Sequence, residues 1–246
     1  MAKTDPALDY TSDGKAVVQR ALYGRRVGRP LPPHRQALVD NLLPAVEIVV
    51  DEQTKLLTPR QAFAKSYDAY WLEIGFGAGE HLVWQAGANP NIGIVGCEPY
   101  LNGVARLLTE MDSGNLGNIR ICRDDARFLL NQLPDASLSR IFILFPDPWP
   151  KSRHHKRRIV GPSVIPQLAR VLSDGSELRV ATDDPGYKSW ILQHVLASGD
   201  FDWLARRPSD WRQRPEDWPP TRYEQKANNA GRRGSFFRFE RRPRVA

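Results

Sequence analysis

The chain contains 246 residues, of which 41% are hydrophobic and 26% are charged, and its formal net charge is +7. This composition excludes a disordered or fibrous protein and allows one large core. The positive charge predicts a polyanionic partner, with nucleic acid ahead of a membrane surface, although a solvated basic surface without a partner is the simpler alternative.

The chain shows no signal for export or for membrane insertion. Its first residues, MAKTDPALDY, contain no apolar signal segment, and no apolar run approaches the roughly 20 residues that a membrane helix needs. Cys97 and Cys122 lie in apolar stretches without metal-ligand spacing, so we expect buried free thiols and no metal site. These features predict a cytoplasmic protein with no membrane association and no obligate protein partner.

The N-terminal part of the chain is polar and basic. Residues 1–35 carry five arginines and the proline-rich RPLPP, which predicts a partly flexible arm. The apolar spacing of residues 36–50 predicts a short helix broken at Pro44. We therefore divide the chain into an arm with a short helix, residues 1–50, and one domain, residues 51–246.

From residue 69 onward, short β-rich runs alternate with amphipathic helical patterns. This alternation predicts an α/β protein with a doubly wound, mostly parallel sheet and helices on both faces. The predicted strands are 69–75, 91–99, 118–125, 139–147 and 176–184, with two closing strands in FDWLA and SFFRFERR. The predicted helices are 79–89, 101–112, 126–133, 164–172 and 185–198.

Acidic residues lie at or near the end of each of the first four predicted strands. Parallel strands end at one edge of the sheet, where open α/β sheets bind their ligands. An acidic residue after the second strand can accept hydrogen bonds from both ribose hydroxyls of a nucleoside. A single carboxylate here could be only a helix cap, but four at one edge favour a ligand site. They are Glu73, Glu98, the pair Asp124 and Asp125, and Asp147.

The first predicted strand runs into a glycine turn, EIGFGAG, whose glycines allow a sharp bend and a close approach to a ligand. Its spacing differs from the G-x-G-x-x-G of dinucleotide sites. Glu73, just before Gly75, would repel a pyrophosphate and suits a cation. S-adenosylmethionine carries a sulfonium and an ammonium and no phosphate, so the turn favours this cofactor.

The segment FPDPWPKSRHHKRRIV follows the fourth predicted strand. Pro146 and Pro148 restrict the backbone around Asp147, which predicts a fixed carboxylate in an extended loop. Trp149 offers a flat face for an unstacked base, and the basic run 151–158 suits RNA phosphates. The structural alternatives are a core tryptophan and a solvated basic face.

Six stretches of the chain resemble, in the same order, those of the bacterial tRNA (guanine-N7)-methyltransferases. They are LEIGFGAG, GCEP, DDA, FPDPWPKSRHHKRRIV, ATDD and TRYE, and they cover about residues 70–225. The resemblance implies a Rossmann-like class I methyltransferase fold with S-adenosylmethionine as cofactor. It also implies tRNA as the substrate, methylated at N7 of guanine 46 in the variable loop.

The resemblance further implies roles for individual residues. Asp147 is the implied catalytic residue. The implied cofactor contacts are Glu73, Gly75, Gly77, Glu98, Asp125 and Asp147. Asp125 is preferred to Asp124 because Ala126 follows it, as in the family's Asp-Ala pair. The implied contacts to the substrate guanine are Lys151, Asp183, Thr221, Arg222, Tyr223 and Glu224. The implied RNA contacts are Arg153, His154, His155, Lys156, Arg157 and Arg158.

Three other functions compete with this interpretation. Amino methyltransferases such as those acting on adenine N6 also carry an acidic, proline-rich loop, but with the order Asp-Pro-Pro-aromatic. A nicotinamide oxidoreductase would need a hydride-site His or Tyr, and none is evident. A non-catalytic RNA-binding protein would not require the set of carboxylates.

Overall fold

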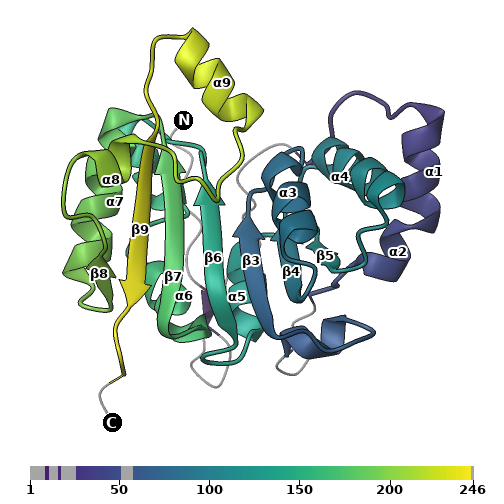
Figure 1. Ribbon diagram of the computed structural model, residues 1–246, viewed down its shortest axis with the longest axis horizontal. Helices are drawn as coiled ribbons and strands as arrows, with labels where there is room; N and C mark the ends of the chain where they lie inside the picture. Colours follow the sequence, from purple (N-terminus) through teal and green to yellow (C-terminus); the bar gives the residue numbers. More distant parts are fainter. Residues whose placement is uncertain (1–8, 11–15, 18–25, 51–57, 245–246) are drawn as a thin grey trace.

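The computed structural model describes residues 9–10, 16–17, 26–50 and 58–244. Its main sheet has the strand order β5-β4-β3-β6-β7-β9-β8, and the order reverses between β3 and β6 (Figure 1). The five strands from β5 to β7 are parallel, whereas β9 runs antiparallel to both β7 and β8. The strands are β3 (Ala69–Ile74), β4 (Ile92–Cys97), β5 (Ile119–Cys122), β6 (Leu138–Leu144), β7 (Leu172–Thr182), β8 (Phe201–Trp203) and β9 (Ser235–Arg241).

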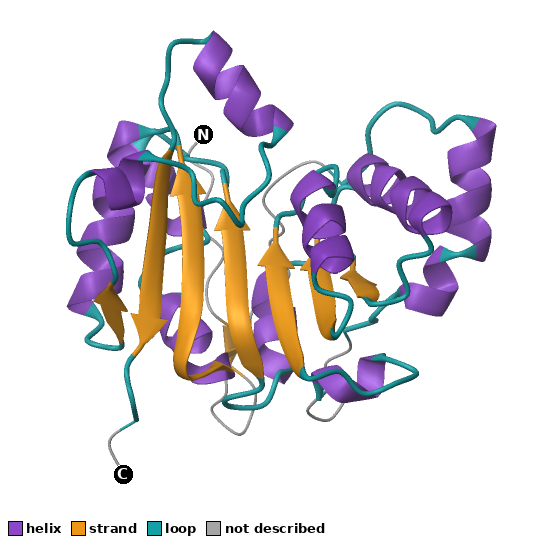
Figure 2. Ribbon diagram, in the orientation of Figure 1, coloured by secondary structure: helices purple, strands orange, loops and turns teal. Residues whose placement is uncertain are grey.

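Helices cover both faces of the sheet, which confirms the predicted doubly wound α/β class (Figure 2). One face carries α3 (Glu80–Ala88) and α4 (Leu101–Gly114), with α1 (Pro33–Asn41) and α2 (Leu43–Val46) beside them. The other carries α5 (Ala126–Gln132), α6 (Ile165–Val171) and α7 (Pro185–Ala197). The remaining elements are α8 (Ser209–Arg212), α9 (Arg222–Asn229), the 3₁₀ helices η1 (Pro59–Ala62) and η2 (Ser152–Arg157), and the pair β1 (Asp9–Tyr10) and β2 (Ala16–Val17).

Alternating side chains of the strands build two cores, one on each face. In β6, Ile141 and Ile143 point into the core of α5, α6 and α7, while Phe142 points into that of α3 and α4. Leu129 of α5 and Leu82 of α3 are fully buried in these two cores. Burial of each such side chain stabilises the fold by about 1.5–3 kcal/mol. Within the described ranges, no helix is both long enough and apolar enough to cross a membrane.

The two cysteines lie opposite each other on neighbouring strands. Cys97 of β4 pairs in register with Cys122 of β5, and both are buried free thiols, as predicted. The hydrogen bond with the Cys122 thiol, together with burial, raises the pKa of Cys97 well above its usual range. A thiol held in its protonated form is a poor nucleophile, which argues against a reactive role for Cys97, and both cysteines belong to the hydrophobic core.

The N-terminal helix differs in detail from its prediction. It begins at Pro33, before residue 36, and its interruption falls at Leu42, ahead of Pro44. Pro44 lies in the first turn of α2, where a missing N–H costs nothing. The Ile48 N–H then donates to the Ile121 carbonyl at 2.7 Å, which joins this segment to β5. Residues 1–8, 11–15 and 18–25 of the predicted arm lie outside the described residues, so the division at residue 50 stays a prediction.

The stretch TRYE begins a helix that is not among the helices predicted from the sequence. Thr221 is the N-cap of α9, and its Oγ accepts a hydrogen bond from the Glu224 N–H at 3.2 Å. The spacing Thr-x-x-Glu is the sequence signal of a helix start and could have identified this helix. Figure 1 shows α9 above the carboxyl ends of β6 and β7, and Tyr223 of this helix lines the cavity described below.

Candidate active site

A cavity of about 390 Å³ lies at the carboxyl ends of β3, β4, β5 and β6, where the strand order reverses. This is the place at which open α/β sheets bind ligands. The lining of the cavity includes four carboxylates and two cationic side chains. Because the carboxylates are in excess, the cavity favours a ligand that carries positive charge. The carboxylates are those of Glu98, Asp124, Asp125 and Asp147, and the cations are Arg127 and Arg157.

The glycine turn after β3 forms one wall of this cavity. Gly75 and Gly77 line it with their backbone, at φ values of 74° and 59°. Side chains are strained in this left-handed region, so glycine is required for the turn. On its other side the turn lies against α4, where a Cβ on Gly103 would lie 2.1 Å from the Gly77 carbonyl oxygen. The close packing of the turn on α4 fixes the wall in place.

Glu98 is held by the backbone at the end of β4. Its carboxylate accepts hydrogen bonds from the Gly77 N–H at 2.9 Å and the Tyr100 N–H at 3.0 Å. Burial nevertheless raises the pKa of Glu98, and the nearby charge of Asp147 adds to this effect. Each carboxylate oxygen keeps a further lone pair, so Glu98 can still accept hydroxyl donors from a ligand.

Glu73 does not line the cavity but lies beneath the glycine turn. Its side chain is buried, and its carboxylate accepts a hydrogen bond from His81 Nδ1 at 2.7 Å. Gln85 Nε2 donates to His81 Nε2 at 3.1 Å and to the Asp217 carbonyl at 2.8 Å. His81 therefore donates from Nδ1 and accepts at Nε2, as a neutral imidazole does. The role of Glu73 as a cofactor contact stays a prediction.

His81 belongs to this buried series of hydrogen bonds but was not among the residues predicted from the sequence. Its ring packs edge-on against Phe142 and Trp218, with centroid distances of 4.6 and 6.3 Å. Through Gln85 it also joins the glycine turn to the chain segment that precedes α9. The sequence signal was only a histidine on an otherwise apolar helix face, which is weak by itself.

Asp124 and Asp125 both line the cavity, but their carboxylates have different partners. Asp125 is the N-cap of α5 and accepts from the Arg127 N–H at 2.9 Å and from Arg127 Nη1 at 2.8 Å. Asp124 accepts from the Asp125 N–H at 2.8 Å and lies 3.6 Å from Arg26 Nη2. Either carboxylate can reach a ligand in the cavity, so the preference for Asp125 stays a prediction.

The loop that carries Asp147 is bent sharply at both ends. Phe145 and Trp149 have φ values of 50° and 43°, which non-glycine residues adopt rarely and at a cost of about 1–2 kcal/mol each. Between them, the prolines restrict the backbone around Asp147, which is exposed at the cavity. This loop geometry had no sequence signal, because bulky residues rarely take left-handed angles.

The basic run does not form one exposed face. Arg153 and Lys156 are exposed on η2, and the Arg157 guanidinium lies 4.9 Å from the centre of the Trp149 ring. Arg158 instead points inward and is 4% exposed. Its Nε donates to the Pro148 carbonyl at 2.8 Å, and its guanidinium lies 4.9 Å from each of two ring centres, Tyr187 and Trp190. Arg158 therefore supports the Asp147 loop from behind.

The two imidazoles of the run, His154 and His155, are half-buried. His154 packs edge-on against Trp149 at a centroid distance of 5.9 Å, and His155 packs against Trp190 at 5.1 Å. Desolvation and the surrounding cations lower the pKa of His154. Both residues thus contact the aromatic side chains that flank the loop.

The residues predicted to contact the guanine fall in several places. Tyr223 lines the cavity beside Glu98 and Asp147, and partial burial and these two carboxylates raise its pKa. Arg222 forms an ion pair with Glu80. Asp183 accepts from Arg232 Nε at 2.7 Å. Lys151, Thr221 and Glu224 do not line the cavity either. Glu224 forms an ion pair with Arg214 at 3.2 Å.

Comparison with known proteins gives a consistent family assignment. A family model described as "Putative methyltransferase" matches residues 68–236. The tRNA (guanine-N(7)-)-methyltransferase of Rhodospirillum rubrum is 50% identical over 226 residues, 91% of this chain and 89% of that protein. The enzyme of the same name from Paramagnetospirillum magneticum is 44% identical over 237 residues, 96% of this chain and 99% of its own length.

Solved structures match the fold at much lower identity. The 16S rRNA (adenine(1408)-N(1))-methyltransferase of Catenulisporales acidiphilia aligns with a TM-score of 0.51 and 15% identity, over 80% of this chain and 99% of that one. The 16S rRNA methyltransferase KamB aligns with a TM-score of 0.51 and 16% identity, over 72% and 90%. At this identity the likeness concerns the fold alone.

Proposed function

The chain belongs to the tRNA (guanine-N7)-methyltransferase family and has the Rossmann-like class I methyltransferase fold; from this premise, we propose that it transfers the methyl group of S-adenosylmethionine to N7 of a guanine in tRNA. The observation that carries the proposal is the acidic cavity at the switch point of the sheet, with Asp147 on a loop bent at both ends. An acidic site suits both a cationic cofactor and a base that becomes cationic.

The cofactor fits the acidic end of the cavity. Glu98 lies at the end of β4, where its free lone pairs can accept the ribose hydroxyls. Asp125 and the adjacent backbone lie at the end of β5, where they can meet the adenine. Gly75 and Gly77 let the methionine part approach the backbone closely. Glu73 stays a proposed contact of the same ligand, and its carboxylate lies beneath the turn with His81 as its partner.

The reaction needs no base to remove a proton from N7. When bound, S-adenosylmethionine would supply an electrophilic methyl group on sulfur, to which guanine N7 would donate its lone pair while the carbon–sulfur bonding electrons leave with sulfur. The protein therefore contributes position and electrostatics. Asp147 faces the cavity and stabilises the positive charge that develops on the guanine ring. Tyr223, at the cavity wall, limits where that ring can lie.

We further propose that the target is guanine 46 in the variable loop and that Lys151, Asp183 and the residues 221–224 hold it. This assignment rests on the resemblance of the motifs. The position of Tyr223, a residue of α9 that lines the cavity, supports it.

The test is methyl transfer from radiolabelled S-adenosylmethionine to an unmodified tRNA transcript, followed by nucleoside analysis and cleavage at the modified position. We expect 7-methylguanosine, with chain cleavage at position 46. Label in methyladenosine would overturn the guanine assignment. 7-Methylguanosine at another position would overturn only the position, and absence of label with a range of tRNA transcripts would overturn the proposed function.

A further inference from the structure

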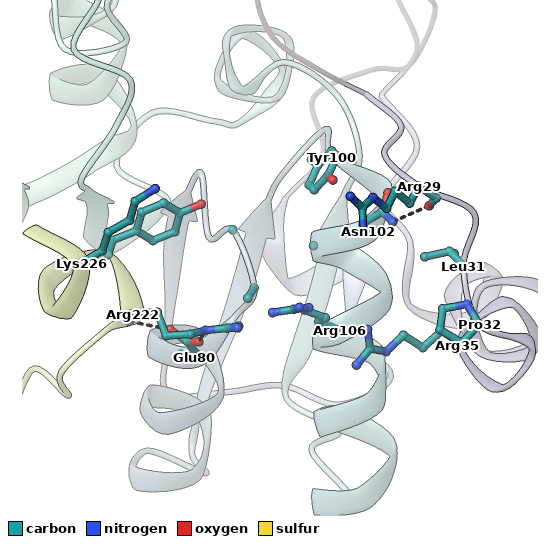
Figure 3. Close-up of a pocket in the computed structure, with 14 residues that line it drawn as sticks. Arg29, Leu31, Pro32, Arg35, Glu80, Tyr100, Asn102, Arg106, Arg222 and Lys226 are labelled. Carbon is teal, nitrogen blue, oxygen red and sulfur yellow. Dashed lines mark hydrogen bonds and ion pairs between the residues drawn. The ribbon is translucent and has the colours of Figure 1, made fainter.

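A second pocket, of about 480 Å³, lies beside the candidate active site but has the opposite charge (Figure 3). It lies over the N-terminal ends of α3 and α4, between α9 and the segment leading into α1. In Figure 3 the guanidinium groups of Arg222, Arg106 and Arg35 form a row across it. Each of these arginines comes from a different helix, so only the tertiary structure brings them together.

The pocket has many cations and few anions. Five cationic side chains line it, and Glu80 is the one carboxylate among its lining residues. Glu80 pairs with Arg222, and no other described carboxylate lies within ion-pair distance of Arg35, Arg106 or Lys226. The N-termini of α3 and α4 add their partial positive charges. One carboxylate does not balance five cations that repel one another, so the pocket favours a polyanion.

The basic pocket and the acidic cavity share a wall. Gly77, Tyr100 and Tyr223 line both of them. A Cβ on Gly77 would lie 3.1 Å from the Tyr223 ring, so the tyrosine lies directly against the glycine turn. A ligand that extends past Tyr223 therefore passes from a site suited to a cation into one suited to anions.

The basic pocket continues as a groove toward Trp84. A neighbouring hollow shares Arg35, Arg106, Arg222 and Glu80 with it and is also lined by Trp84 and Glu110, so cations still outnumber carboxylates there. The Trp84 side chain is 41% exposed, which is unusual for a large aromatic residue on a helix. Cations followed by an exposed aromatic ring are the features with which proteins bind single-stranded nucleic acid.

We propose that this groove, defined by Arg35, Arg106, Arg222, Lys226 and Trp84, binds the phosphate backbone of the nucleotides that flank the target guanine. The phosphates lie against the arginines, and Trp84 stacks on an unpaired base at the far end. This inference rests on the proposed function and adds an RNA-binding surface formed by α1, α3, α4 and α9. The groove lies on the other side of Tyr223 from the acidic cavity. It is a different surface from the basic run of η2, which comes directly after the Asp147 loop in the sequence.

The test is the double variant Arg35→Ala/Arg106→Ala. Neither side chain is buried, so we expect folding and cofactor affinity to be unchanged. We expect tRNA affinity to fall roughly 10- to 100-fold at low salt, and the slope of log Kd against log salt to lose about one unit per arginine. KM for tRNA should rise far more than kcat falls. Binding is measured at equilibrium over several salt concentrations.

The matched control is Arg60→Ala/Arg207→Ala, which removes the same charge from exposed positions outside the groove. If both double variants show the same affinity and salt slope, the groove does not bind RNA. An equal loss of cofactor and tRNA affinity in the groove variant would also overturn the inference. A wild-type enzyme that does not methylate tRNA refutes the proposed function instead, so the two failures are distinguishable.

The Trp84 end of the groove has its own test. Stacking does not involve ions, so Trp84→Ala should weaken tRNA binding roughly tenfold without changing the salt slope, and Trp84→Phe should restore most of the affinity. Inorganic pyrophosphate, used as a competitor, should displace tRNA from the wild type only weakly. Strong competition by pyrophosphate would point to a free polyphosphate as the natural ligand and overturn the RNA assignment.

Discussion

At the scale of single residues, Asp147 depends on its backbone for its position. The loop has left-handed residues at both ends and prolines on both sides of the aspartate. Such strain persists only where the surrounding structure holds it, and it is common at sites where position matters. The backbone thus holds the exposed carboxylate of Asp147 in a fixed place at the cavity.

The first prediction concerns this charge. Asp147→Asn keeps the shape of the side chain but removes the charge that stabilises the cationic ring, so we expect kcat to fall about 10²- to 10³-fold. The Kd for tRNA should change less than threefold, because the phosphates provide most of the affinity. Single-turnover methylation and equilibrium tRNA binding check the two expectations. Equal losses in both would show that Asp147 serves substrate binding.

Glu98 gives the second prediction, which concerns pH. Burial raises the pKa of its carboxyl group above the ordinary value of 4.5. Folding thus favours the protonated form, and ionisation of Glu98 costs stability as the pH rises through the raised pKa. The ionised form accepts the ribose hydroxyls, so cofactor affinity should be full above the raised pKa and be lost as the pH falls through it.

Calorimetric titration with S-adenosylmethionine between pH 4.5 and 8 measures this dependence. Glu98→Gln has no ionisable group at this position, so its affinity should be lower at neutral pH and should lose this pH dependence. The same pH profile in wild type and variant would assign the titration to another carboxylate of the cavity.

At the scale of elements, the loop and the basic run form one unit. Arg158 comes from the basic run, yet its guanidinium lies under the loop, between the Pro148 carbonyl and the rings of Tyr187 and Trp190. The exposed Arg153, only five residues away, has no such contacts to the loop. Two arginines of one basic run therefore differ in environment, since Arg158 is buried under the loop and Arg153 is exposed to solvent.

The third prediction compares these two arginines. Arg158→Ala loses a hydrogen bond and two cation–π contacts, so the free energy of unfolding should fall by about 2–3 kcal/mol. Arg153→Ala is a surface change and should stay within about 0.5 kcal/mol. Urea unfolding measures both. The salt slope of tRNA binding should drop for Arg153→Ala alone, and a drop of the same size for Arg158→Ala would contradict the inward position.

The fourth prediction concerns the link between the glycine turn and α9. His81→Ala leaves the buried Glu73 carboxylate without its imidazole donor, so we expect a loss of about 3 kcal/mol in unfolding free energy. Gln85→Met removes a donor from His81 but no partner of the carboxylate, so its cost should be smaller. Thermal unfolding ranks the two variants. Equal losses of unfolding free energy in the two variants would show that the imidazole donor to Glu73 is not the main source of the stabilisation.

At the scale of the whole molecule, two sites of opposite charge lie next to each other. The acidic cavity is assembled from the ends of four strands, and the basic groove from four helices that are distant in sequence. Tyr223 of α9 lies at their boundary. Under the proposed function, this arrangement would separate a cationic cofactor from the anionic backbone of RNA while bringing the reacting atoms together.

The fifth prediction concerns the thermal stability of the protein with a ligand bound in the cavity at the ends of the central strands. A ligand that binds only the folded state stabilises it by about 2.7 kcal/mol at one hundred times its Kd. For a chain of this size, S-adenosylmethionine should therefore raise Tm by roughly 5–10 °C. NAD⁺ should give no shift, and a comparable shift with NAD⁺ would revive the oxidoreductase alternative.

The sequence by itself determined the α/β class, the order along the chain of strands β3 to β9 and helices α3 to α7, and the carboxylates at the strand ends, because apolar periodicity and turn residues are local signals. It also indicated the family, through six short motifs in order. It did not determine that Phe145 and Trp149 have left-handed backbone angles, that TRYE starts a helix, or that the Arg158 side chain points inward. These depend on neighbours in space.

Only the tertiary structure decided which charged groups meet. Glu73 is predicted to contact the cofactor, which stays a prediction, and the fold pairs its carboxylate with His81 beneath the turn, a partner that no sequence pattern indicated. Arg35, Arg106 and Arg222 are far apart in the chain and were not predicted as a group. Electrostatic sites depend on distances between elements, and these are set by the packing of helices on the sheet, which no local pattern encodes.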